Sequence, residues 1–391
     1  MVTCKVSQSS IARVSPQVVS LAHSNQSDGL RSSLKSTHNP EPAMSACMTG
    51  RERLTRSIER RHPDCIPVLH WVQEGALHQF GDALYRLAER CPEDGGDLTP
   101  TSRPITKPDP AHLVNGGYRR TLIDEWGVQW EQRAFGIMGH VHEYLVQGRD
   151  DLAKVRRPDV PIPGSDAARQ LAAATAAHQA RGFYSRQGWI TLWETMSALR
   201  RMDDLLIDIA EDNELANALA DQVMETRLKQ VHALLDAGAD GIQFADDWGS
   251  QTCTIISMNL WRRFFLPRYR RLIEPVRARG RHVFFHCCGH SLPLFDDLAG
   301  LGVQVIWPQV GTNDQAAVAA ALKRTGMGLF WDVDRQHIMS RGTPAEVTAS
   351  IVEAKARFAD PAGGLIFWGE LYPGYPLANV EALWDGFQRL R

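Results

Sequence analysis

Residues 281–290 read RHVFFHCCGH, and this stretch decides how the rest of the chain is interpreted. The apolar, β-prone run 283–285 predicts a buried strand of a parallel sheet. At the end of this run, His286 and Cys288 are two residues apart, so both side chains point to one side of the strand and Cys287 points to the other. Imidazole and thiolate together form a ligand set that suits zinc. The alternative is a core strand that ends in two buried cysteines and a hydrogen-bonded histidine.

Short apolar strands alternate with amphipathic helices on both sides of this stretch. The predicted strands are 65–71, 183–190, 241–245, 282–286, 303–307, 327–331 and 365–368. The helices predicted between and after them are one that ends near residue 199, then 213–238, 261–279, 292–301, 314–324 and 344–359. Repeated βα units of this length predict a parallel sheet, and seven or eight of them close into a barrel. We therefore expect an α/β fold, a (β/α)₈ TIM barrel, in which the pattern identifies seven strands and leaves the eighth unassigned.

The first part of the chain has a different organisation. Residues 1–48 are rich in Ser, Gln, Asn and Thr and show no helical or strand period, so we expect a disordered extension followed by one domain over residues 49–391. Helical patterns cover residues 51–62, 74–90 and 167–180. Between the last two helices, a long irregular excursion contains an aromatic, alternating stretch at 118–135 with a central glycine. This stretch predicts a β-hairpin inserted beside the barrel.

Composition excludes several classes of function. The 391 residues are 43% hydrophobic, which supports a full core, and the net charge of -2 gives no electrostatic reason to bind nucleic acid or an anionic membrane. There is no run of about 18 apolar residues that could span a bilayer. The odd number of cysteines, seven, favours a reducing compartment, and we expect a cytoplasmic protein with a small-molecule substrate. The oligomeric state stays open, a homodimer being one option.

Polar and aromatic residues follow the predicted strands, where the active site of a (β/α)₈ barrel lies. We predict catalytic roles for Asp246 and Asp247, and the alternative for either is the capping of a helix N-terminus. The predicted substrate contacts are His70, Trp248, Gln309, Asp334, Gln336 and Tyr372. Trp307, Trp331 and Trp368 stand at three further strand ends, where we expect most of them to pack in the barrel rather than stack on a flat substrate.

Three stretches carry a resemblance to a known family. They are GADGIQFADDWGSQ at 238–251, the segment 261–310 around RHVFFHCCGH, and FWDVDRQHIMSRGTPAEV at 330–347. Together with the opening RERL and the DEWGVQW insertion, they resemble the uroporphyrinogen decarboxylase superfamily. The resemblance runs from Arg51 to the end of the chain, and it implies a (β/α)₈ barrel.

That superfamily has two broad branches. True uroporphyrinogen decarboxylases need no cofactor and carry an MRQAGR-type segment after the first strand, whose arginines suit the acidic side arms of a tetrapyrrole. The corresponding residues 69–80 read LHWVQEGALHQF and contain no arginine. The other branch comprises methyltransferases that serve corrinoid proteins, and its HxCG motif matches residues 286–289. The chain therefore resembles the methyltransferase branch more closely.

In the zinc methyltransferases a third ligand, a cysteine, follows the last strand, whereas residues 367–380 read FWGELYPGYPLANV. Glu370 is the nearest replacement, so we expect His286, Cys288 and Glu370 to hold zinc with an open fourth position. The resemblance implies methyl transfer to or from methylcobalamin carried by a partner corrinoid protein. One alternative is a metal-independent decarboxylase of uroporphyrinogen or a related acid, in which Asp246 stabilises a developing positive charge. The other is a non-catalytic barrel that binds a corrinoid or a protein partner.

Overall fold

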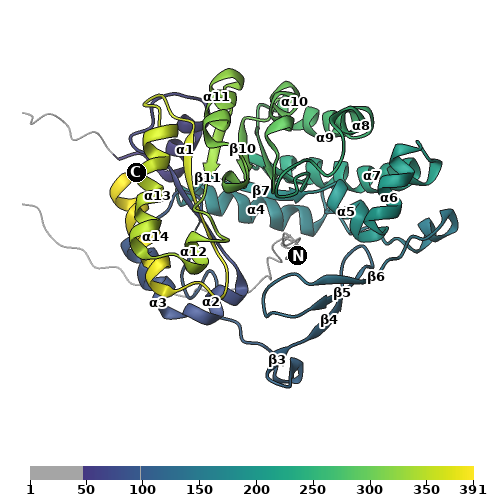
Figure 1. The fold of residues 1–391 in the computed structure, drawn as a ribbon, viewed down its shortest axis with the longest axis horizontal. Helices are drawn as coiled ribbons and strands as arrows, with labels where there is room; N and C mark the ends of the chain where they lie inside the picture. Colours follow the sequence, from purple (N-terminus) through teal and green to yellow (C-terminus); the bar gives the residue numbers. More distant parts are fainter. Residues whose placement is uncertain (1–46, 97) are drawn as a thin grey trace, which may run out of the picture.

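Seven parallel strands form the central sheet of the computed structural model, which describes residues 47–96 and 98–391 (Figure 1). The predicted disorder of residues 1–48 thus falls, except for the last two, outside the described residues. The strands are β1 (Val68–Val72), β7 (Arg186–Ile190), β8 (Gly241–Ala245), β9 (His282–Cys287), β10 (Val305–Pro308), β11 (Gly328–Trp331) and β12 (Leu365–Leu371). Their hydrogen-bonded order is β1-β12-β11-β10-β9-β8-β7. The TIM-like barrel is confirmed, and so are the seven predicted strands.

Helices follow the strands and cover the outer face of the sheet. Those before β8 are α1 (Gly50–Ile58), α2 (Glu74–Phe80), α3 (Asp82–Arg90), α4 (Asp166–Ala180), α5 (Trp193–Leu199), α6 (Met202–Ala210) and α7 (Glu214–Asp236). The later ones are α8 (Met258–Phe264), α9 (Leu266–Ala278), α10 (Phe295–Leu301), α11 (Gln315–Thr325), α12 (Ile338–Arg341), α13 (Pro344–Phe358) and α14 (Leu377–Leu390). The helix predicted over 74–90 is split in two because Gly81 adopts a positive φ of 54°. No helix of the described residues is long and apolar enough to cross a membrane.

An irregular segment takes the position of the eighth strand. It passes between β1 and β7, the two edges of the seven-stranded sheet. The backbone N–H of Asp94 donates to the carbonyl of Val68 in β1 at 2.8 Å, and Tyr184, just before β7, donates to the carbonyl of Asp94 at 3.4 Å. The described residues 91–96 make these single hydrogen bonds without forming a strand, and with Gly95 and Gly96 they lack the apolar run that predicts one.

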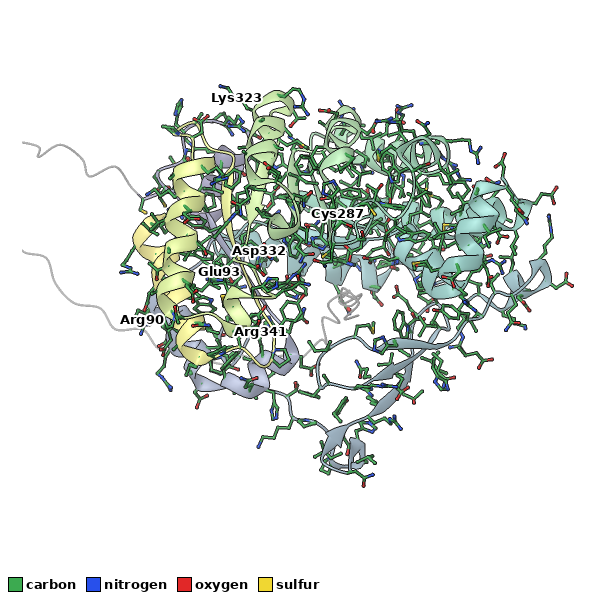
Figure 2. All side chains as sticks on the ribbon, in the orientation of Figure 1. Arg90, Glu93, Cys287, Lys323, Asp332 and Arg341 are labelled. Atoms are coloured by element: carbon green, nitrogen blue, oxygen red, sulfur yellow. The ribbon has the colours of Figure 1, made fainter. Side chains whose placement is uncertain are left out.

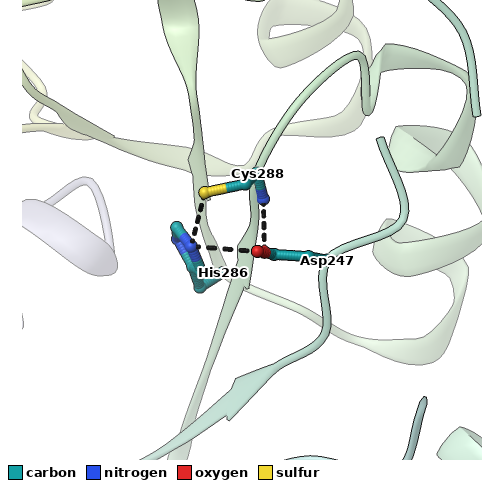
Figure 3. Close-up of side chains that lie close together, drawn as sticks. All are labelled: Asp247, His286 and Cys288. Atoms are coloured by element: carbon teal, nitrogen blue, oxygen red, sulfur yellow. Dashed lines mark hydrogen bonds and ion pairs between the residues drawn. The ribbon is translucent and has the colours of Figure 1, made fainter. Parts of the chain in front are cut away.

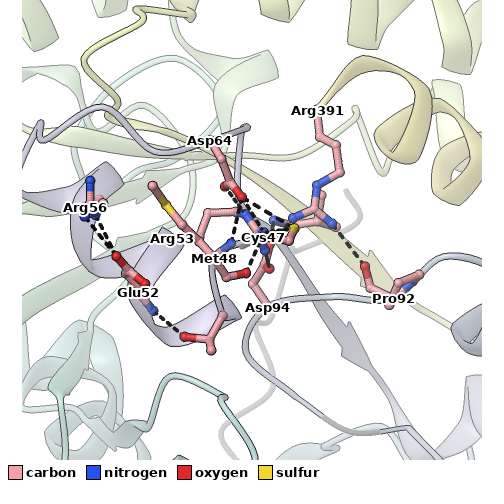
Figure 4. Close-up of polar contacts among 11 residues, drawn as sticks. Cys47, Met48, Glu52, Arg53, Arg56, Asp64, Pro92, Asp94 and Arg391 are labelled. Carbon is pink, nitrogen blue, oxygen red and sulfur yellow. Dashed lines mark hydrogen bonds and ion pairs between the residues drawn. The ribbon is translucent and has the colours of Figure 1, made fainter. Parts of the chain in front are cut away.

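A buried ionic network fixes this segment (Figure 4). Asp94 pairs with Arg53 of α1 and with Arg391, whose Nη2 lies 2.6 Å from Oδ2 of Asp94. The same oxygen accepts the N–H of Val68 at 2.8 Å. Arg53 also donates to Asp64. Since the Asp94 carboxylate is almost fully buried, both guanidinium partners are needed to offset its desolvation.

The excursion before α4 carries two small antiparallel sheets, seen to one side of the barrel in Figure 1. Their strands are β2 (Leu113–Val114), β3 (Gly117–Tyr118), β4 (Arg120–Ile123), β5 (Gln129–Gln132) and β6 (His140–Glu143). The predicted hairpin is confirmed as β4 and β5, and β6 adds a third strand. Arg227 of α7 links this sheet to the barrel, because its guanidinium lies 5.1 Å from the ring centroid of Trp126 and its Nε donates to the carbonyl of Thr191, which follows β7.

The barrel interior is filled with large aromatic side chains. Alternation along the strands turns Trp307 and Trp368 inward, with ring centroids 4.6 Å apart, and Phe330 stacks on Trp368 at 5.2 Å. Trp331, next to Phe330, therefore belongs to the layer between the sheet and the helices, where it meets Phe367. The three tryptophans pack against protein, as expected, and Trp307 and Trp368 with Phe330 fill the barrel below the carboxyl ends of the strands.

Candidate metal centre

Three side chains meet at the carboxyl ends of β8 and β9 (Figure 3). Nε2 of His286 lies 3.2 Å from Sγ of Cys288 and 3.5 Å from Oδ1 of Asp247. One ligand atom of each residue lies within 4.8 Å of the others. Two of the three, His286 and Cys288, are the predicted zinc ligands, and the third is a residue predicted to be catalytic.

The local backbone explains why these groups converge. His286 faces the barrel interior from the end of β9, and Cys287 points the opposite way, with its Sγ 3.3 Å from the backbone N of Trp248. The chain then turns at Gly289, with a φ of 72°, and a Cβ at this position would lie 2.1 Å from the carbonyl oxygen of Gly249. This turn directs the N–H of Cys288 toward Asp247, whose Oδ1 accepts it at 2.7 Å.

Burial keeps the imidazole of His286 neutral. The pKa of His286 lies well below its ordinary value, chiefly because the ring is fully buried and also because the Arg335 charge is nearby. The ring packs on Trp307, with centroids 4.0 Å apart, and on Trp189 at 5.5 Å. A neutral, rigidly packed imidazole is the form of histidine that binds a metal.

The residues present fit a zinc ion. Around tetrahedral zinc, a nitrogen and an oxygen ligand are roughly 3.4 Å apart, and a nitrogen and a sulfur ligand roughly 3.6 Å apart. The separations of 3.5 Å for His286 to Asp247 and 3.2 Å for His286 to Cys288 are close to these values. One nitrogen, one sulfur and one oxygen donor also leave a fourth position for a substrate atom.

A buried arginine separates Glu370 from this group. Nη2 of Arg335 lies 2.7 Å from Sγ of Cys288, and its Nη1 donates to Glu370 at 2.9 Å. The hydroxyl of Tyr372 donates to the other oxygen of Glu370 at 2.7 Å and lies 3.2 Å from Nη1 of Arg335. The structure thus differs from the predicted ligand set in its third member, because Asp247, and not Glu370, joins His286 and Cys288.

Asp332, labelled in Figure 2, adds a second carboxyl to this side of the site. Burial raises the pKa of Asp332 to about 7, the nearby Arg335 lowers it, and Glu370 raises it. Burial and Glu370 also raise the pKa of Tyr372 well above its ordinary value. A carboxyl with a pKa near 7 can hold or release a proton at neutral pH.

Asp246 and Trp248, both predicted at the site, face away from it. The carboxylate of Asp246 accepts the backbone N–H groups of Leu192, Trp193 and Glu194 at 2.8, 3.0 and 2.7 Å, and the hydroxyl of Tyr269. It therefore caps the N-terminus of α5, which was the alternative for this residue. Trp248 is fully buried and donates from Nε1 to Tyr269 at 3.1 Å, so its ring lies in the core.

His70 does not face the barrel either. Its ring stacks on Trp384 of α14 at 4.2 Å, and burial lowers the pKa of His70 to about 3. The reason is strand alternation: Leu69 and Trp71 take the inward positions of β1, so His70 is turned toward the helices. His70 thus lies apart from the metal-ligand candidates, and its predicted contact with a substrate stays a prediction.

The remaining predicted contacts shape the loops of the site. Oε1 of Gln309 accepts the N–H of Gly289 at 3.2 Å and so supports the turn after β9. Oδ1 of Asp334 accepts the N–H of Gln336 at 2.8 Å and orders the loop after β11. Tyr372 lies beside Glu370, as described above. The substrate contacts predicted for Gln309, Asp334, Gln336 and Tyr372 stay predictions.

Arg335 is the residue that sequence reasoning missed. It stands between Asp334 and Gln336, which the strand-end argument did select. Its position in the loop after β11 could have indicated a role, because the loops at the carboxyl ends of barrel strands form the active site. Its side chain, 9% exposed, contacts both Cys288 and Glu370.

The barrel and the group at its carboxyl ends define an α/β-barrel protein with a candidate metal centre. Residues 188–390, more than half of the chain, match the family model described as uroporphyrinogen decarboxylase (URO-D). The chain belongs to the uroporphyrinogen decarboxylase family. Its sequence has no significant match among curated proteins.

Solved structures with a similar fold include a methyltransferase from Methanosarcina mazei. The TM-score is 0.57 at 15% sequence identity, and the match covers 88% of this chain and 99% of that chain. A B12-independent methionine synthase from a Shewanella species gives a TM-score of 0.39 at 12% identity, covering 80% of this chain and 85% of that chain. The first similarity supports the fold assignment over nearly the whole described chain.

Proposed function

We propose that this chain is a zinc-dependent methyltransferase that acts with a corrinoid protein. The observation that carries the proposal is the convergence of Asp247, His286 and Cys288 at the carboxyl ends of the barrel strands. The fold that it shares with the methyltransferase from Methanosarcina mazei agrees with this proposal.

The charges around the centre support a divalent cation. Asp247, Glu370 and a Cys288 thiolate would carry three negative charges, whereas Arg335 carries one positive charge. All four groups lie in a largely buried region, where uncompensated charge is costly. A doubly charged cation would bring the sum over these four groups to zero.

The residues of the chain divide the remaining tasks. When bound, zinc would act as a Lewis acid that lowers the pKa of a thiol or hydroxyl that takes part in methyl transfer. Asp247 would orient Cys288 through its backbone N–H, and the aromatic rings below His286 would keep water out of the barrel. Asp332, whose pKa is about 7, would accept or return the proton that methyl transfer displaces.

The partner corrinoid protein would dock at the barrel mouth, where the three ligand candidates lie. The methyl group would pass from methylcobalamin on this partner to the substrate or, in the reverse direction, from the substrate to the demethylated corrinoid. The chemistry of the ligand set leaves the identity of the other methyl-bearing substrate to experiment.

Metal content measured on untagged protein tests the proposal. We expect about one zinc per chain by elemental analysis in the wild type, and loss of zinc in Cys288→Ser and His286→Ala. Cys287→Ser is the matched control, because the thiol of Cys287 points away from the centre. This variant should keep its zinc. A wild-type protein that stays metal-free after incubation with zinc would refute the proposal.

One observation favours a second candidate function, a metal-independent decarboxylase. The 2.7 Å contact between Arg335 and Sγ of Cys288 places a guanidinium beside a predicted zinc ligand, where it would satisfy the thiolate without a metal. Conversion of free methylcobalamin in the presence of a thiol, followed by its absorption spectrum, separates the two. Methyl transfer that requires zinc supports the first function. Release of carbon dioxide from uroporphyrinogen or a related acid by metal-free protein supports the second.

A further inference from the structure

A cavity of about 210 Å³ lies inside the barrel next to the irregular eighth position. It is lined by residues of β1, β7 and β12 and by the segment around Glu93. Trp71 and Trp368 form apolar walls, and Glu93, Arg103 and Arg186 bring charged groups to it. None of the three metal-ligand candidates contributes to its lining, so the cavity is separate from the candidate metal centre.

The two arginines have neutral partners only. Nη1 of Arg186 donates to Oε1 of Gln243 at 2.6 Å, and its guanidinium lies 4.7 Å from the ring centroid of Trp368. Nη2 of Arg103 donates to the carbonyl of Val72 at 2.8 Å. Among the described residues, the side-chain hydrogen bonds of the two guanidinium groups go to this carbonyl and this amide and to no carboxylate. Each therefore keeps N–H groups available to the cavity.

Glu93 does not neutralise the arginines at neutral pH. Its Oε2 accepts the backbone N–H of His70 at 2.6 Å, and burial raises the pKa of Glu93 to about 8. Burial lowers the pKa of Arg186 only to about 10, so this guanidinium stays charged. The cavity accordingly carries a net positive charge in a region of low dielectric, where a bound anion would be stabilised strongly.

We propose that this cavity binds a small carboxylic acid, with its carboxylate on Arg103 and Arg186 and its apolar part against Trp71 and Trp368. Arginine favours carboxylates because its planar N–H groups can form paired hydrogen bonds with both oxygens. The aromatic walls favour a ligand with an apolar body over a bare inorganic anion. The volume, below the usual range for drug-sized ligands, limits the acid to a single ring or a short chain.

The inference does not depend on the proposed methyl transfer, because no metal ligand takes part. Titration calorimetry at pH 7 would compare benzoate with benzamide, which has nearly the same shape and no charge, and with inorganic phosphate. We expect benzoate to bind the wild type and the Cys288→Ser variant equally, and neither benzamide nor phosphate to bind. Equal binding of benzamide, preferential binding of phosphate, or no binding of any small carboxylate tested would each overturn the proposal.

Substitutions locate the site. Arg186→Gln and Arg103→Gln should each weaken benzoate binding about tenfold or more, as expected for loss of a hydrogen bond to a charged group. Arg262→Gln is the matched control, because this arginine is half exposed on α8 and pairs with Asp297 at 2.9 Å. Since a buried substitution can prevent folding, each variant is first checked by circular dichroism. Arg186→Lys keeps the charge without the planar fork and should bind benzoate more weakly than the wild type. Unchanged affinity in folded arginine variants would place the ligand elsewhere and refute the site.

Discussion

Substitutions at the adjacent residues Asp246 and Asp247 should affect different properties. A change at Asp246 should lower stability, and a change at Asp247 should remove bound metal. In Asp246→Asn, the amide keeps one acceptor oxygen, and the other oxygen becomes an N–H donor. If the remaining oxygen continues to accept from Leu192, Trp193 and Tyr269, the N–H of Glu194 faces another donor and loses its partner. Leaving one buried donor unsatisfied costs about 1–3 kcal/mol.

The magnitude depends on the charge state of Asp246 as well. Burial raises the pKa of Asp246 to about 7, so the charged and protonated forms are close in free energy at neutral pH and loss of the charge itself costs little. We therefore expect Asp246→Asn to lie at the lower end of that range. Asp246→Ala removes four hydrogen bonds, and at about 1 kcal/mol each it should cost about 4 kcal/mol.

Urea unfolding followed by circular dichroism would measure the effect as a shift of the midpoint at constant slope. Asp247→Asn is the matched control, because its amide oxygen can still accept the N–H of Cys288. This variant should change the free energy of unfolding by less than about 1 kcal/mol and lose bound zinc. The reasoning is refuted if Asp246→Asn unfolds like the wild type and loses activity only, since the carboxylate would then act in catalysis.

Three further outcomes follow from the fold. Asp94→Asn should lower the free energy of unfolding by about 3–5 kcal/mol, because it removes the buried carboxylate that Arg391 and Arg53 share and leaves Arg53 with Asp64 alone. A urea midpoint within error of the wild type would contradict this. Glu93 has a pKa of about 8 in the folded protein, above its ordinary value of 4.5. Between these two pH values the native state therefore binds a proton that the unfolded state has lost. As the pH rises through this range, the free energy of unfolding should fall by up to about 1.4 kcal/mol per pH unit. Glu93→Gln should remove this pH dependence. If the urea midpoints of the variant and the wild type change in parallel from pH 5 to 8, the raised pKa is not that of Glu93. Thr343→Ala should cost about 1 kcal/mol, because Thr343 and Glu346 form a capping box at the start of α13, and Val352→Ala on the exposed face of the same helix serves as the comparison.

Most of the barrel could be predicted because strand and helix periods are local. The run 283–285 is apolar whatever surrounds it, and β9 forms there as expected. The eighth position could not be predicted in this way. The segment around Asp94 has no strand pattern, and its place is fixed by Arg53 and Arg391, which are 41 and 297 residues away in the chain. Such long-range ion pairs leave no periodic signal.

The candidate site was predictable to the extent that strand alternation determines it. The two-residue spacing correctly separated His286 and Cys288 from Cys287, because alternation is a property of any strand. The same rule, applied to β1, would have turned His70 outward and prevented its assignment as a substrate contact. Asp246 and Asp247 were harder to separate, since their roles depend on where the turn after β8 begins.

The third ligand depends on competition between charges, which spacing does not reveal. Glu370 lies at the end of β12, and Arg335 occupies the space between it and Cys288 and contacts both. A carboxylate that pairs with a buried guanidinium is a poor metal ligand. If it moved to the metal, the arginine charge would be left buried without a partner. Oδ1 of Asp247 lies 3.5 Å from Nε2 of His286. Arg335 thus holds the Glu370 carboxylate, and Asp247 is the carboxylate that lies beside His286.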